Sequence, residues 1–420
     1  MKKRILAAAL SLALTLATLL TLSGCSPAVQ ATDLMAGIKA KPVSTDIDIA
    51  GEDAVAVTDL AVRLFQQNAE AGKDTLISPL SILCALAMTA NGARGETLSQ
   101  MEEVFGLSVE ELNEYLYAYT NALPAGDKYK LSVANSIWFK DTESFTVEPD
   151  FLQANANWYG AGLYKAPFDH STLSAINNWV QKNTDGMIKD ILDSIPEKAV
   201  MYLVNALAFD AEWQNIYFEN QVHDGVFTKE DGTEQNVELM YSTEYQYLED
   251  TNAEGFMKYY ADQKYAFAAL LPNEDISVAA YIDSLTGEKL AGILAAARSV
   301  PVNAAIPKFK SENSVEMSEI LMAMGMEDAF DSTVSDFSGI GTSTEGNLAI
   351  SRVLHKTFVA VDEKGTKAGA STVVEMLTGS AMIEPEQMKT VYLDRPFIYM
   401  IIDCKANLPV FIGAAMDMHK

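Results

Sequence analysis

The spacing of hydrophobic residues predicts helices in the first half of the chain. One helical face carries apolar residues at helical intervals, namely Val55, Leu60, Leu64 and Phe65. Ser78 and Pro79 have the types expected for the cap and first turn of the next helix. Ser108 and Glu111 have the spacing of a capping box ahead of another helix. A later helix around Ile176 is expected to end near Gly186.

Strand patterns alternate with these helices and then become more frequent. Residues 131–137 alternate in polarity, and residues 199–209 form a nearly continuous apolar run typical of a strand covered on both faces. Asp231-Gly232 is a hairpin signal within residues 227–239. Later strands are expected at Asn303–Phe309, Leu348–Asp362, Phe397–Asp403 and Pro409–Ala415. Helices followed by strands, with no linker between them, predict an α+β fold in a single domain over residues 53–420.

Composition and charge narrow the classes of function. The 420 residues are 49% hydrophobic and 21% charged, which is typical of a globular chain with a large core. Acidic residues number 57 against 30 basic ones, and the formal net charge is −27. No basic run follows the first four residues. We therefore expect no nucleic-acid partner, because this field repels phosphate backbones.

The N-terminus has the pattern of a secretory signal. A basic start is followed by an apolar run from Ile5 to Leu22 and then by Ser23-Gly24-Cys25. A single transmembrane anchor is the alternative, because the run is nearly long enough to span a bilayer. Small residues directly before a cysteine resemble the lipobox of bacterial lipoproteins. That resemblance implies a signal peptide over 1–24, a lipid on Cys25, a flexible tether over 25–52, and an extracellular location on the outer face of a bacterial membrane.

Signatures of enzymes and metal sites are missing from the sequence. The four histidines form no H-E-x-x-H motif, and there is no G-x-S-x-G elbow or phosphate-binding loop. We therefore expect no enzyme activity, metal or cofactor. His355 lies among apolar strand residues, where the pattern favours a core histidine over a catalyst. Cys84 and Cys404 are expected to be free thiols, although the sequence leaves a disulfide between them open.

Residues 361–377 have a pattern that allows two interpretations. Small or apolar residues recur at every second position, at Thr366, Ala368, Ala370 and Thr372, as on the buried face of a strand. Such small side chains make a poor permanent core strand, and the segment leads into Gly379-Ser380. One interpretation is an edge strand followed by a loop. The other is a segment that can be either loop or strand.

Six motifs in order resemble the serpin family over residues 53–418. They are Leu76–Ile82 with Asn91–Thr97, Ile176–Gly186, Leu203–Phe209 with Trp213, Asp336–Ile340 with His355-Lys356 and Glu363–Thr372, Arg395–Phe397, and Pro409–Gly413. The resemblance implies one domain with three sheets, about nine helices and an exposed reactive-centre loop. It also implies a monomeric inhibitor of serine proteases that acts as a suicide substrate, with the cut loop inserting into the main β-sheet. The alternatives are a non-inhibitory serpin that acts as a binding protein and an unrelated lipoprotein such as a solute-binding protein.

The same resemblance assigns roles to individual residues. The loop hinge would comprise Glu363, Gly365, Thr366, Ala368, Ala370 and Thr372. A polar cluster under the opening point of the sheet, the shutter, would comprise Ser78, Ser81, Asn205 and His355. Trp213 and Glu363 would lie at the top of the sheet, the breach, where the loop first enters. Lys367 and Gly369 depart from the family pattern, which has an acid and an alanine there.

The resemblance also locates the bond that a protease would cut. Counting from Glu363 gives Gly379-Ser380, with Leu377-Thr378 and Met382-Ile383 as alternatives because the loop is longer than is usual. No Lys or Arg lies between Ala368 and Met388. We therefore expect an elastase-like or subtilisin-like target and no inhibition of trypsin-like enzymes.

Overall fold

Nine α-helices and four β-sheets occupy the residues that the computed structural model describes, which are 31–123, 129–344, 346–366 and 388–418. The helices are α2 (Glu52–Asn68), α3 (Pro79–Ala90), α4 (Gly95–Phe105), α5 (Val109–Asn121), α6 (Pro149–Trp158), α7 (His170–Asn183), α8 (Val278–Asp283), α9 (Gly287–Ala295) and α10 (Ser318–Ala323). Two 3-10 turns, η1 (Glu219–Gln221) and η2 (Asp328–Phe330), connect other elements. The predicted α+β class is confirmed.

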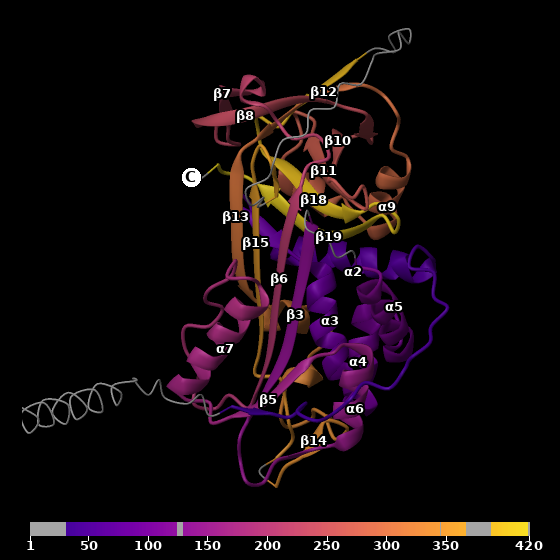
Figure 1. Cartoon of the computed structure of the whole chain (residues 1–420), viewed down its shortest axis with the longest axis vertical. Helices are drawn as coiled ribbons and strands as arrows, with labels where there is room; N and C mark the ends of the chain where they lie inside the picture. The colour runs from indigo at the N-terminus through magenta and orange to yellow at the C-terminus, as the bar shows by residue number, and fades with distance from the viewer. Residues whose placement is uncertain (1–30, 124–128, 345, 367–387, 419–420) are drawn as a thin grey trace, which may run out of the picture.

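The largest sheet, called the main sheet below, has seven strands, and its long members run along the length of the molecule (Figure 1). In spatial order they are β1 (Thr32–Asp33), β5 (Gly162–Ala166), β3 (Tyr129–Lys140), β6 (Met201–Glu212), β16 (Gly365–Thr366), β15 (Arg352–Val361) and β13 (Phe309–Glu316). The strands β6 and β15 flank β16. Beyond the end of β16 they pair directly with each other, in parallel, over residues 202–208 and 352–358. The main sheet therefore contains a parallel pair of long strands at its centre.

Two further sheets form the upper part of the molecule in Figure 1. The second sheet has six strands: β2 (Thr75–Ile77), β19 (Leu408–Ala415), β18 (Phe397–Asp403), β11 (Tyr265–Pro272), β10 (Ala253–Tyr259) and β9 (Gln246–Glu249). The third sheet has four: β17 (Lys389–Tyr392), β12 (Val302–Pro307), β8 (Glu234–Glu244) and β7 (Val222–Thr228). A two-stranded pair, β14 (Gly341–Thr342) and β4 (Thr146–Val147), adds to the three expected sheets.

Helix ends follow local chemistry. The Ser78 hydroxyl caps α3 by accepting from Ser81 N–H at 3.4 Å, and every residue of α3 is buried. Ser108 and Glu111 form the predicted capping box at the start of α5. The helix α7 ends at Asn183 rather than near Gly186, because residues 185 and 186 both take positive φ, at 50° and 74°, and leave the helical conformation.

Both faces of the main sheet are covered, which explains the continuous apolar run in β6. The larger core includes α3 and the second sheet on one face. A smaller core lies under α7 on the other face, where Trp138, Ile176 and Tyr202 are buried. The first eleven residues of β6, apart from one half-buried position, are therefore buried on both sides.

The strand expected over residues 303–309 is two strands in different sheets. The strand β12 ends at Pro307 in the third sheet, and β13 begins at Phe309 in the main sheet. Between them, Lys308 N–H donates to Glu238 O at 2.9 Å. An unbroken apolar pattern does not reveal this change of sheet, because both halves are buried.

Residues 31–51, expected as part of a flexible tether, lie against the domain instead. Thr32 and Asp33 pair with β5 at the edge of the main sheet, and Leu34 N–H donates to Leu163 O at 2.9 Å. Ile49 is buried in the core. The edge of β5 offers unpaired backbone groups, and this segment satisfies them.

Candidate functional site

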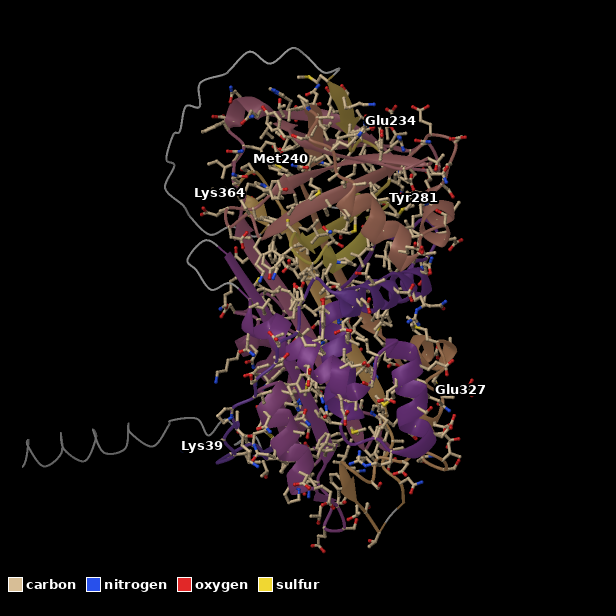
Figure 2. All side chains as sticks on the ribbon, turned by 90° about the vertical axis from the view of Figure 1, so that its right-hand side faces the viewer. Lys39, Glu234, Met240, Tyr281, Glu327 and Lys364 are labelled. Atoms are coloured by element: carbon tan, nitrogen blue, oxygen red, sulfur yellow. The ribbon has the colours of Figure 1, made fainter. Side chains whose placement is uncertain are left out.

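The predicted hinge begins inside the main sheet. After β15 the chain turns at Asp362, whose Oδ1 accepts from the N–H groups of Lys364 at 2.8 Å and Gly365 at 3.2 Å. Gly365 and Thr366 then form β16, which lies between β6 and β15 and is antiparallel to both. Lys364 lies in the upper half of the molecule, far from Lys39 near the opposite end (Figure 2). The top of the sheet therefore already holds the first two residues of an additional strand.

Close packing fixes both residues of β16. A Cβ atom on Gly365 would lie 2.0 Å from the carbonyl oxygen of Ala211, so only glycine fits here. The side chain of Thr366 is fully buried, at 0% exposure. Its hydroxyl and the Tyr260 hydroxyl share a hydrogen bond of 2.6 Å.

Trp213, predicted at the breach, holds the turn that leads into β16. Its backbone N–H donates to Lys364 O at 2.8 Å, and its indole Nε1–H donates to Asp362 O at 2.8 Å. Its ring stacks on Tyr260 with centroids 4.5 Å apart and an interplanar angle of 14°. One tryptophan thus connects the turn to the tyrosine that binds Thr366.

An ion-paired lysine contacts the residue that opens the hinge. The Lys308 Nζ lies 3.1 Å from Glu363 Oε2 and 3.3 Å from Glu238 Oε1. Partial burial opposes charge on Glu363, but hydrogen bonds and the ammonium of Lys308 lower the pKa of its carboxyl overall. The same pairs raise the pKa of Lys308 against the effect of its burial. Lys308 therefore joins the hinge to strand β8 of the third sheet.

Several residues around the hinge were not predicted from the sequence. Tyr260 and Lys308 are two of them. A third is Lys258, which is 2% exposed, pairs with Glu244 at 2.8 Å and lies over the rings of Tyr217 and Trp213 at 4.3 and 5.5 Å. Tyr217 N–H also donates to Glu363 O at 2.8 Å. These contacts join segments far apart in the chain, and no local spacing marks them.

The structure brings the four predicted shutter residues together below the hinge. His355 Nδ1 lies 2.6 Å from Asn205 Oδ1, and Ser78 N–H donates to His355 Nε2 at 3.0 Å. The Asn205 Nδ2 group donates to Ser81 O and to Asn135 Oδ1. All four side chains are buried. Within the described part of the chain, Ser81 Oγ has no hydrogen-bond partner.

These contacts define the protonation state of His355. The backbone N–H of Ser78 requires Nε2 as an acceptor, and Asn205 Oδ1 requires Nδ1–H as a donor. The ring is therefore neutral with its proton on Nδ1. Burial lowers its pKa to about 3, which agrees with this assignment.

Other predicted site residues lie outside the described residues. They are Cys25, the hinge positions Ala368, Ala370 and Thr372, and the bond candidates Leu377, Thr378, Gly379, Ser380, Met382 and Ile383. Cys84 and Cys404 are both free thiols, and burial raises the pKa of each to about 12. Among the described side chains, no group of three or more His, Cys, Asp or Glu could hold a metal ion.

Comparison with known proteins identifies the family. The model of the serpin (serine protease inhibitor) family matches residues 55–418. The chain belongs to the serpin family. Human leukocyte elastase inhibitor is 30% identical over 375 residues, which cover 85% of this chain and 97% of the relative. A serpin-like protein of Thermococcus kodakarensis is also 30% identical, over 86% of this chain and 85% of its own length.

Solved serpin structures agree with the fold. The native state of tengpin, a thermophilic serpin, has a TM-score of 0.88 at 49% identity and covers 93% of this chain and 100% of its own. The latent state of tengpin has a lower TM-score of 0.79, over 90% of this chain and 100% of its own. Human thyroxine-binding globulin, at 21% identity and a TM-score of 0.79, shares the fold over 89% of this chain and all of its own. As a whole, the fold of this serpin is thus more similar to native tengpin than to latent tengpin.

Proposed function

We propose that this serpin inhibits elastase-like or subtilisin-like serine proteases as a suicide substrate. A protease would cut the reactive-centre loop and form an acyl-enzyme. The N-terminal part of the loop would then insert between β6 and β15 before the ester is hydrolysed, and the attached protease would be carried across the sheet and distorted.

The observation that carries this proposal is the position of β16. Gly365 and Thr366 already lie between β6 and β15, antiparallel to both strands. Below them, β6 and β15 form a parallel ladder. A longer inserted strand would replace one parallel ladder by two antiparallel ones, which are more stable per residue. Insertion would therefore be favourable once cleavage frees one end of the loop.

The register of β16 supports insertion over the following residues. Gly365 and Thr366 lie opposite Glu212 and Ala211, and Thr366 lies opposite Val361 on the other side. Continued at one residue per position, this register would bring Glu375 beside Tyr202 and Arg352, the last pair of the parallel ladder. The candidate bonds lie two to eight residues further on, so an inserted strand of this length would leave each of them at the far end of the sheet.

The same register connects the hinge with the shutter. Thr372 would arrive beside Asn205 and His355, on the face where Thr366 points into the core. The present hydrogen bond between His355 and Asn205 would have to break to admit the new strand. Small residues at positions 368, 370 and 372 suit this passage, because bulky or charged side chains would clash there or be buried without partners.

The target class follows from the loop sequence. Between Ala368 and Met388 there is no basic residue for the acidic pocket of a trypsin-like enzyme. We expect a complex that survives boiling in SDS with a subtilisin-type or elastase-type enzyme and none with trypsin. Mass spectrometry of the C-terminal fragment released from the complex would identify the bond. Cleavage without a complex would favour the non-inhibitory, ligand-binding alternative, and a trapped protease joined at Lys367 or Lys389 would contradict the assignment.

We also propose that a lipid on Cys25 attaches the protein to the outer face of a bacterial membrane. The described helices include none long and apolar enough to cross a membrane. From Cys25 to Thr32 an extended chain spans at most about 25 Å, so the lipid would hold the β1 end of the domain close to the bilayer. Lys364 lies in the upper half of the molecule and Lys39 in the lower half (Figure 2), which would keep the hinge away from the membrane. Labelling with a radioactive fatty acid should be lost in Cys25→Ala, and labelling that persists would contradict the anchor.

A further inference from the structure

A cavity of about 440 Å³ lies beside the hinge, between the third sheet and the end of the main sheet. Its walls come from β7, β8, residues 308–310 and residues 360–362, together with Met418. This volume lies within the range of sites for small molecules. All of these walls belong to described residues.

The floor of the cavity is apolar and formed by well-packed side chains. It is lined by Val237, Phe309, Val361 and Met418, each of which is at most 8% exposed. The Phe309 ring packs edge-on against Tyr399 with centroids 5.1 Å apart. An apolar ligand body could bury surface against these side chains without first ordering them.

Two exposed carboxylates lie side by side at the rim of the cavity. Asp224 of β7 and Glu238 of β8 lie directly opposite each other, and like charges in such cross-strand positions repel. Glu238 pairs with Lys308 at 3.3 Å, but Lys308 also pairs with Glu363. The Asp224 backbone belongs to the β7–β8 ladder, but its carboxylate makes no hydrogen bond or ion pair with any described residue. The sheet side of the cavity therefore has one carboxylate without a partner and one that shares its cation.

We propose that this cavity binds a small organic ammonium ion with an aromatic or branched apolar body. The ammonium group would lie between Asp224 and Glu238, and the body would rest on Phe309, Val361 and Met418. The net charge of −27 attracts cations to the surface in general. The exposed Lys310 also lines the cavity and carries the opposing charge, and its flexible side chain can turn into water.

Binding would reach the hinge through Lys308. An ammonium ion on Glu238 would leave Lys308 to pair with Glu363 alone and would hold the start of the hinge more firmly. The ligand should therefore slow loop insertion, a consequence that rests on the proposed inhibitory function. The binding itself does not depend on that function, because it uses only the native cavity.

The test uses the intact protein without protease. Fluorescence titration with 1-naphthylmethylamine should show saturable binding, and 1-naphthoate, with the same body and opposite charge, should bind far more weakly. Asp224→Asn should weaken binding of the amine about fivefold, whereas Glu234→Gln, on the same sheet but outside the cavity, should leave it unchanged. Asn236→Trp should block it. Equal binding of the anion, no saturable binding of the amine, or an unchanged affinity in Asp224→Asn would overturn the proposal.

Discussion

Replacing Thr366 with arginine tests the hinge at its most buried position. The Thr366 side chain has no exposed surface, and its one side-chain hydrogen bond is to the Tyr260 hydroxyl. An inserted guanidinium would find that single partner and the stacked rings of Tyr260 and Trp213. The Lys258 ammonium, 5.5 Å from the Trp213 centroid, has the same sign of charge. The arginine would therefore be buried without compensation.

The size of the effect follows from the cost of that burial. Burying an unpaired ion costs several kcal/mol even after the surroundings relax. In the uncut protein the arginine can leave β16 for water, but insertion would have to bury it. If about 4 kcal/mol of this cost is added on going to the transition state for insertion, the loop inserts about a thousandfold more slowly. Hydrolysis of the acyl-enzyme is unchanged by the substitution. Thr366→Arg should therefore be cut at the same bond and released as a substrate.

The assay is a titration of a subtilisin-type enzyme with increasing inhibitor. The unaltered protein should abolish activity at equimolar amounts, whereas Thr366→Arg should be consumed without inactivating the enzyme. Thr366→Val is the matched control, because it keeps the shape and loses only a hydrogen bond worth about 1 kcal/mol. It should remain an inhibitor. An SDS-resistant complex formed by the arginine variant at equimolar amounts would refute the inward position of Thr366.

Three more predictions follow from the hinge and shutter contacts. Gly365→Ala should displace β16 from the sheet, because the new Cβ would lie 2.0 Å from Ala211 O. The Trp213 N–H, which donates to Lys364 O, should then exchange its hydrogen faster, and an unchanged exchange rate would contradict the displacement. His355→Ala should leave Ser78 N–H and Asn205 Oδ1 without partners, at a cost of about 1–3 kcal/mol, and should speed conversion to latent or polymeric forms on mild heating. A variant that stays monomeric and inhibitory would argue against the shutter role. Because burial lowers the pKa of His355 to about 3 from 6.5, the unfolded chain binds the extra proton between these values. Stability should thus fall as pH drops through this window, by up to about 1.4 kcal/mol per pH unit, and thermal unfolding of His355→Gln should show a smaller decline.

Sequence patterns predicted elements best where burial is uniform along a strand. The strand β18 begins and ends at the predicted residues, Phe397 and Asp403, because every side chain in it is buried. The prediction of one strand over residues 303–309 was wrong, because the apolar pattern continues while the chain passes from β12 in one sheet to β13 in another at Lys308. The strands β9–β11 and the helices α8 and α9 were not predicted at all.

The residues of the candidate site also fall into those that a local sequence pattern predicts and those that it does not. The small residues at alternate hinge positions are visible in the sequence, and so is Gly365. The pattern around His355 indicated only a core histidine, and its assignment to a polar cluster came from family resemblance. Its partners Ser78 and Asn205 lie 277 and 150 positions away in the chain. Tyr260 and Lys308 were missed for the same reason, because contacts made only by the folded chain leave no local pattern.

The most direct test of the account is heat denaturation before and after a single cut within residues 377–383. Limited digestion with a subtilisin-type enzyme, followed by its inactivation, would supply the cut protein. If the freed segment inserts between β6 and β15, the cut protein should unfold at a much higher temperature than the intact one, because the parallel ladder becomes two antiparallel ladders. A cut protein that unfolds at the same temperature or a lower one would contradict loop insertion, and with it the proposed mechanism.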